Sequence, residues 1–209
     1  RELGQEQTTI LNLDDATGYF KRSFQYAEKV HDRRQMALSL TNLAQVQLER
    51  DQFQLAQENT DRAIEFLFPL NDFNGLGESH NVLGMIYKEQ KKYDLASTHL
   101  NTALVYYEST NNREKIAGVY HNVGTVFQKQ KKYRRALNHL NHSIEIREKF
   151  GAQNQIYGTY RVIAEVYEET NNTEKALEYM QYYLDYVDSN TTLQAATKIA
   201  ELSESYRSE

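Results

Sequence analysis

The chain has 209 residues, with 24 Lys and Arg against 29 Asp and Glu, a formal net charge of −5 and no Cys. The lack of Cys excludes disulfides and thiolate metal sites, and the acidic balance argues against a dedicated nucleic-acid-binding domain, which usually carries a basic face. No apolar run approaches the roughly 20 residues that cross a bilayer, so we expect no membrane segment and a cytoplasmic location. Because the sequence starts at Arg1 without a signal-peptide pattern, we expect a fragment of a longer protein.

A 40-residue internal repeat organises the sequence, as is typical of solenoids. Residues 1–31 read as a partial repeat, in which 1–12 supply part of a helix A and 13–31 supply a helix B. Full repeats follow at about 37–72, 77–112, 117–152 and 157–190, and residues 191–207 read as a closing helix A. One register is small in every copy: Gly4, Ala44, Gly84, Gly124 and Ala164. A second register is always alanine: Ala16, Ala56, Ala96, Ala136 and Ala176.

Each copy has the spacing of two helices joined by a polar turn. In the third full copy, one helical face carries residues at i, i+3, i+4 and i+7, namely Tyr120, Val123, Gly124 and Phe127. Ala136 and Leu140 mark a similar face after the turn at 130–132. A glycine inside a helix costs about 1 kcal/mol relative to alanine, so Gly84 and Gly124 indicate a close approach of helix A to helix B.

The copy with the best pattern carries Leu83-Gly84, Tyr87, Ala96, Leu100 and Ala103, and it resembles the tetratricopeptide repeat. The 40-residue length is similar to the repeats of Rap-type and NprR-type quorum-sensing regulators, Pins-type adaptors and the sensor modules of signalling proteins. The resemblance implies one all-α domain over residues 1–209, folded as a right-handed solenoid of about ten or eleven antiparallel helices.

In that family, ligands bind a concave groove lined by the A helices, so the resemblance implies the groove residues by their position. They are Asn42, Gln45, Asn81, Lys88, His121, Asn122, Gln128, Lys129, Arg161 and Glu165. An Asn inside a helix is unfavourable by propensity, but its carboxamide can both donate to and accept from a peptide backbone. We therefore expect Asn42 and Asn122, which share one repeat position, to bind a peptide. The alternative is that they only face water on the groove wall.

A basic cluster marks the turns between helix A and helix B in two adjacent copies. It comprises Lys88, Lys91 and Lys92, then Lys129, Lys131, Lys132, Arg134 and Arg135. The equivalent stretch at 168–174 is acidic, and such an asymmetry can orient an acidic partner and speed its capture. The alternative is a set of ordinary exposed lysines, and nucleic-acid binding through this rim is the weaker interpretation.

The sequence carries no enzyme motif. Residues 75–80 do not continue as G-x-G-x-x-G, and there is no phosphate-binding loop or H-E-x-x-H. His139 and His142 stand at i, i+3 but lack a matching set of further ligands. We therefore expect no catalysis, no cofactor and no metal site.

Two functional hypotheses remain. The first is a non-catalytic protein- or peptide-binding module that serves as the sensor or scaffold part of a signalling or regulatory protein. The second is a peptide-regulated Rap-like or NprR-like regulator that acts on a response regulator or on transcription. In addition, the ends of a truncated solenoid expose apolar edges, so the sequence allows self-association through either end.

Overall fold

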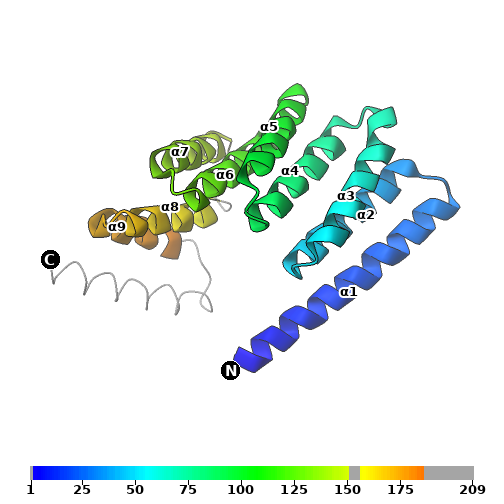
Figure 1. Ribbon diagram of the computed structural model, residues 1–209, viewed down its shortest axis with the longest axis horizontal. Helices are drawn as coiled ribbons and strands as arrows, with labels where there is room; N and C mark the ends of the chain where they lie inside the picture. Colours follow the sequence, from blue (N-terminus) through cyan, green and yellow to red (C-terminus); the bar gives the residue numbers. More distant parts are fainter. Residues whose placement is uncertain (1, 151–155, 186–209) are drawn as a thin grey trace. The chain divides into compact units, whose positions relative to one another are not determined.

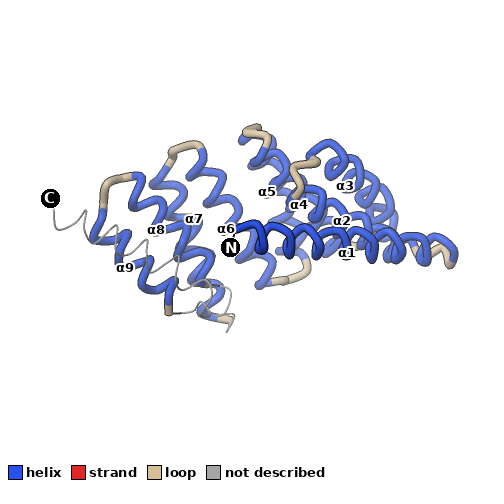
Figure 2. Tube along the Cα trace, turned by 90° about the horizontal axis from the view of Figure 1, so that it is seen from below, coloured by secondary structure: helices blue, strands red, loops and turns tan. Residues whose placement is uncertain are grey.

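A computed structural model describes residues 2–150 and 156–185, with side chains from residue 13 onward. These residues form nine α-helices and one short 3-10 helix, with no strand among them (Figure 1, Figure 2). The helices are α1 Glu2–Lys29, α2 Arg33–Glu49, α3 Phe53–Leu67, η1 Phe68–Leu70, α4 Phe73–Glu89, α5 Tyr93–Ser109, α6 Arg113–Lys129, α7 Tyr133–Lys149, α8 Tyr157–Glu169 and α9 Thr173–Leu184. The predicted all-α architecture is confirmed, and the predicted closing helix at 191–207 lies outside the described residues.

The helices pack in pairs within two compact units, residues 1–112 and residues 113–209. In the first unit α2 pairs with α3 and α4 with α5, and in the second α6 pairs with α7 and α8 with α9. The first helix of each pair is a helix A and the second a helix B. Each helix A also contacts the other helix A of its unit, α2 with α4 and α6 with α8. The predicted site residues lie on these A helices.

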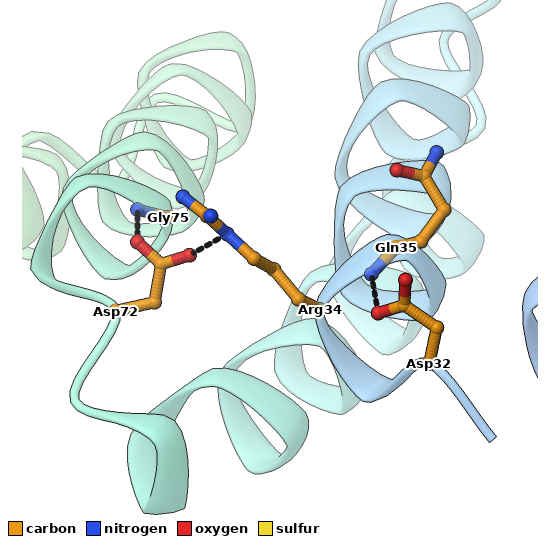
Figure 3. A network of polar contacts seen from close by, with 5 residues as sticks. All are labelled: Asp32, Arg34, Gln35, Asp72 and Gly75. Carbon is orange, nitrogen blue, oxygen red and sulfur yellow. Dashed lines mark hydrogen bonds and ion pairs between the residues drawn. The ribbon is translucent and has the colours of Figure 1, made fainter.

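Aspartate caps fix the starts of two A helices (Figure 3). The Asp32 carboxylate accepts a hydrogen bond from the Gln35 backbone N–H at 3.0 Å, and Asp72 accepts one from Gly75 in the same way at 3.0 Å. A cap of this kind satisfies a backbone donor that the helix leaves unpaired. Both helices therefore start before the repeat boundaries at 37 and 77 that the hydrophobic spacing indicated. The spacing could not indicate these earlier starts, because polar cap residues are not part of the hydrophobic pattern.

The first segment departs from the prediction. Residues 2–29 form one continuous helix, so the expected break between a helix A at 1–12 and a helix B from 13 is wrong. In the complete hairpins the break is made by one residue with positive φ, namely Asp51, Lys91, Lys131 or Asn171. The equivalent residue 40 positions earlier is Leu11, within the sequence Ile10-Leu11-Asn12. A left-handed conformation costs about 1–2 kcal/mol for such a residue, and Leu strongly favours a helix, so the helix runs on.

The small-residue registers mark the closest helix–helix contacts. Ala56, Ala96 and Ala136 are fully buried, as the alanine register predicts. A Cβ atom added to Gly124 would lie 2.6 Å from Leu140 Cγ and 3.3 Å from the Ala136 carbonyl oxygen. Gly84 has the same surroundings in the α4–α5 pair. Only a glycine fits these two crossings without displacing its neighbours.

A line of neighbouring rings, which we term the ring ladder, joins helix A to helix B in three hairpins; the rings are stacked in α4–α5 and α6–α7 and tilted in α8–α9. In α4–α5 the His99 ring lies 5.3 Å from His80 and 5.2 Å from Tyr87 between centroids, and the two His Nδ1 atoms are 3.0 Å apart. The equivalent rings are Tyr120, His139 and Phe127 in α6–α7, and Tyr160, Tyr179 and Tyr167 in α8–α9. In α2–α3 an amide pair replaces them, and Asn59 Nδ2 donates to Gln47 Oε1 at 2.8 Å.

Two glycines on α6 give a matched test of the close crossing. We expect Gly124→Ala to destabilise the protein, because overpacking of this kind costs about 1–3 kcal/mol and exceeds the gain in helix propensity. Gly118→Ala should instead stabilise it by about 0.5–1 kcal/mol, because nothing lies within 4 Å of the added Cβ atom. Urea unfolding of both variants measures the two changes, and an equal gain in both would show that the crossing is not tight.

The ring ladder of α4–α5 should make stability depend on pH. Burial, and then the neighbouring His99, lower the pKa of His80 from 6.5 to about 4. The unfolded chain therefore binds more protons between these two values, and stability falls as the pH drops through this window. We expect the melting temperature to decrease between pH 7 and about pH 5. His80→Leu, which installs the residue found at Leu40, should reduce that decrease, whereas an unchanged decrease would contradict the assignment.

Candidate functional site

Side-chain hydrogen bonds join α2 to α4, and we term this set the first seam. Thr41 Oγ1 and Ser79 Oγ lie 3.2 Å apart, and both residues are buried. Gln45 Nε2 donates to Glu78 Oε1 at 3.0 Å, and the Tyr107 hydroxyl of α5 donates to Glu78 Oε2 at 2.9 Å. Burial, followed by the Glu78 carboxylate, raises the pKa of the Tyr107 hydroxyl, which therefore keeps its proton. Glu78 thus connects three helices.

The starts of α2 and α4 are also linked (Figure 3). Arg34 Nε donates to Asp72 Oδ2 at 2.6 Å, while the other oxygen of Asp72 caps α4. The Asp72 side chain is 10% exposed, but the Arg34 side chain is 66% exposed, so water screens much of this ion pair. One carboxylate therefore both starts α4 and holds it beside α2.

The predicted binding residues of the first unit differ in whether their side chains already make contacts within the protein. Asn42 is half-buried on α2, and no hydrogen bond of its carboxamide is recorded with any described residue. Gln45 already uses its amide nitrogen in the first seam. Asn81 is half-buried on α4, and Lys88 Nζ pairs with its neighbour Glu89 at 2.9 Å. Asn42 can therefore bind a ligand without breaking a hydrogen bond to any described residue.

The second seam joins α6 to α8 in the other unit. His121 Nδ1 lies 3.0 Å from Thr159 Oγ1, and Arg147 Nη1 of α7 donates to the same hydroxyl at 2.7 Å. Arg147 is 8% exposed, and burial lowers the pKa of its guanidinium. His121 and Thr159 stand 80 positions after Thr41 and Ser79, so the two seams use the same repeat positions.

Other predicted residues of the second unit belong to this seam. Gln128 is only 3% exposed, and its Nε2 donates to Glu165 Oε2 at 3.3 Å and to Glu169 Oε1 at 2.9 Å. Arg161 Nη1 is bonded to Glu165 Oε1 at 2.8 Å, although Arg161 itself is exposed. Asn122 is half-buried on α6. Gln128 and Glu165 therefore connect the A helices, while Arg161 and Asn122 retain exposed surface.

Sequence reasoning missed four residues that organise the two seams, namely Glu78, Tyr107, Arg147 and Thr159. A signal for Glu78 was present in the repeat, because the same position holds Leu38, Gly118 and Gly158 in the other copies. One charged side chain at a position that is otherwise apolar or glycine indicates a specific partner. The buried hydroxyl and guanidinium partners depend on helix packing and left no such signal.

The basic turns are exposed in both units. The exposed residues are Lys91 and Lys92 in the first unit, and Lys129, Lys131, Lys132, Arg134 and Arg135 in the second. An open groove of about 480 Å³ in the second unit is lined by Phe127, Arg134, Arg135, Asn138 and His139. The Arg135 guanidinium lies 5.8 Å above the Phe127 ring, a cation–π distance. This groove combines positive charge with an aromatic surface.

Among the residues with described side chains, no group of three His, Cys, Asp or Glu is placed to hold a metal ion. Within the described helices, none combines the length and apolar character that a membrane crossing requires.

Residues 76–149, from within α4 to the end of α7, match the tetratricopeptide repeat family model. The structure is similar to BtubC (BKLC) from P. vanneervenii, with a TM-score of 0.77, 16% identity and coverage of 92% of this chain and 83% of that one. It is similar to aspartyl phosphate phosphatase F from Bacillus subtilis (TM-score 0.78, 18% identity, 92% of this chain, 52% of that one). It is also similar to a Rap protein complexed with competence and sporulation factor (TM-score 0.80, 19% identity, 94% and 55%).

The chain spans about half the length of the phosphatase and Rap chains. A comparison with curated protein sequences gave no match. At identities of 16–19% the structural neighbours show the fold and not the activity. Three observations agree with this fold: the 40-residue period, the paired helices with a small residue at each crossing, and the segment that matches the family model. Residues 76–149 therefore match the tetratricopeptide repeat family, and the described chain has the fold of a tetratricopeptide-repeat solenoid with 40-residue repeats.

Proposed function

We propose that the chain is a non-catalytic protein- or peptide-binding module whose A-helix surfaces receive the ligand. The observation that carries this proposal is the Asn42 carboxamide, which is half-buried on α2 and has no recorded hydrogen bond among the described residues. A carboxamide can pair with both the N–H and the C=O of a peptide backbone. Asn122 occupies the same repeat position on α6, where it is half-buried.

The two seams support binding because they hold the A helices in place before a ligand arrives. Glu78 ties α2, α4 and α5 together, and Gln128 ties α6 to two carboxylates of α8. Side chains that are already ordered lose less entropy on binding. The bonds of Gln45, Gln128 and Glu165 therefore contribute rigidity, and Asn42, Lys129 and Arg161 are the groups that we assign to ligand contact.

The charge distribution favours a partner that carries carboxylates. Lys129, Lys131 and Lys132 are exposed, and the adjacent groove offers the Phe127 ring with two guanidinium groups. Complementary charge raises the rate at which partners associate. The structural neighbour complexed with competence and sporulation factor supports a peptide as one class of partner.

A finer proposal is that the module is the sensor or scaffold part of a signalling protein. In a second form of this proposal it acts as a peptide-regulated, Rap-like regulator of a response regulator or of transcription. Two of the similar structures, a Rap protein and an aspartyl phosphate phosphatase, favour this second form. Size-exclusion chromatography with purified response regulators, with and without a bound peptide, tests it. A peptide-dependent complex supports regulation, and the absence of any complex favours the scaffold role.

Asn42→Ala should weaken peptide binding without changing stability. Peptides selected from a random library on the immobilised chain provide the probes, and calorimetry measures their affinity. We expect a loss of about tenfold in affinity, because a net hydrogen bond is worth about 1 kcal/mol or slightly more. The matched control is Asn101→Ala on α5, an exposed Asn on a helix B. Equal affinity of Asn42→Ala and the parent for every selected peptide would refute the role of Asn42.

The basic turn of the second unit should govern association rate more than stability. We expect Arg134→Glu combined with Arg135→Glu to slow association with acidic peptides and to reduce its dependence on salt, because exposed charges act mainly through steering. Stopped-flow measurements at low and high salt test this expectation. A mutant whose association rate and salt dependence equal those of the parent would exclude the rim from recognition.

A further inference from the structure

Arg147 is a buried charge that forms no ion pair among the described residues. It is 8% exposed, and its Nη1 donates to the uncharged Thr159 hydroxyl at 2.7 Å. Its Nε–H is buried and has no hydrogen-bond acceptor in the described part of the chain. Burial lowers the pKa of the guanidinium more than the Glu114 carboxylate raises it. Because an arginine stays protonated in proteins, this buried charge is unfavourable until a partner neutralises it.

The repeat shows which residue on helix A accompanies this position of helix B. The pairs are Leu38 and Leu67 in α2–α3, Glu78 and Tyr107 in α4–α5, and Gly118 and Arg147 in α6–α7. The first pair is apolar at both positions, and in the second the Tyr107 hydroxyl donates to Glu78 Oε2 at 2.9 Å. The third pair sets a charge opposite a residue that has no side chain. Of these three hairpins, α6–α7 therefore lacks a complement at this position.

Open space lies where the missing side chain would stand. A Cβ atom added to Gly118 would have no neighbouring side chain or helix of the described chain within 4 Å, and the same holds for Gly158 at the equivalent position on α8. Both glycines are half-buried, as Glu78 is. Gly158 directly precedes Thr159, to which Arg147 is bonded. The space beside these glycines can therefore admit a group from the surface toward the guanidinium.

We infer that the second unit binds a carboxylate of its ligand beside Gly118, where the carboxylate pairs with Arg147. This inference rests on the proposed peptide-binding function and names the chemical group that the second unit recognises. The bound carboxylate takes the repeat position of Glu78, whose own carboxylate connects helix A to the buried end of helix B in the first unit. One carboxylate can accept from two N–H groups of a guanidinium at once. It therefore uses the Nε–H that has no acceptor within the described chain.

A double-mutant cycle tests this pairing without any ligand. We expect Gly118→Glu to melt about 2–4 °C higher than Gly118→Gln, because Glu supplies the negative charge that Arg147 lacks. The Gln variant is matched in size and in the gain of helix propensity over Gly. In an Arg147→Met background, or in the second charge-free background Arg147→Gln, the Glu and Gln variants should melt alike. A Glu variant with no advantage in the parent, or with the same advantage after Arg147 is replaced, overturns the inference.

Peptides selected from a random library on the immobilised chain test the ligand. Each is also synthesised with an amidated C-terminus, and again with Asp and Glu replaced by Asn and Gln. We expect one of these replacements to weaken binding to the parent at least about tenfold in calorimetry. That loss should disappear in Arg147→Met and in Gly118→Glu, whose own carboxylate occupies the site. The matched control is Lys149→Met, which removes an exposed cation from the same helix and should behave like the parent.

The peptide series also identifies the source of the carboxylate and separates the two possible failures. A loss on amidation assigns the C-terminus of the peptide, and a loss on replacement of Asp and Glu assigns a side chain. A selection that yields no binding peptide overturns the proposed function together with the inference. Peptides that bind equally well without their carboxylates, or that lose as much affinity for Arg147→Met as for the parent, overturn the carboxylate site alone.

Discussion

Each hairpin depends on one contact, in which a small residue of helix A lets the backbone approach a buried side chain of helix B. Leu100 and Leu140 are fully buried and fill the space where a side chain at residue 84 or 124 would stand. Close approach at this crossing brings the neighbouring turns of both helices within reach of each other. The ring ladder forms on the turns beside this crossing, and it would be lost if the helices moved apart.

With that crossing kept constant, the other contacts of the repeat can vary. The ladder positions hold imidazole and phenol rings in α4–α5, four tyrosines including Tyr182 around α8–α9, and an amide pair in α2–α3. The seams vary in the same way, since a hydroxyl pair in one unit becomes a histidine–threonine pair in the other. Each copy therefore keeps its shape while its polar chemistry changes, which is how a repeat protein acquires a specific binding surface.

The sequence predicted those parts of the fold that repeat. The alanine and glycine registers located the helix crossings of the four complete hairpins, because strict spacing reflects packing that these copies share. Singular features were not predictable in this way. To predict the continuous α1, one must know that Leu11 continues the helix at a position where the other copies turn. The helix starts at Arg33 and Phe73 depend on capping by single aspartates.

The candidate site shows the same limit. Register placed Asn42 and Asn122 on the A helices, but it also assigned Gln128 and Glu165 to a ligand, although these two side chains bond to each other between α6 and α8. Register identifies the helix face on which a residue lies, and it cannot tell whether a neighbouring helix already uses that side chain. The buried partners Tyr107 and Arg147 come from B helices, which the family resemblance does not associate with the groove.

The tyrosine packing of α8–α9 has a spectroscopic consequence. The chain contains 16 Tyr and no Trp, so tyrosine alone gives its intrinsic fluorescence. Tyr160 and Tyr182 lie 5.4 Å apart between ring centroids, and Tyr167 and Tyr179 lie 5.6 Å apart. Rings this close exchange excitation energy and couple their electronic transitions, so this hairpin should dominate the near-ultraviolet circular dichroism. Loosening of α9 would then be visible as an optical signal of its own, without any attached dye.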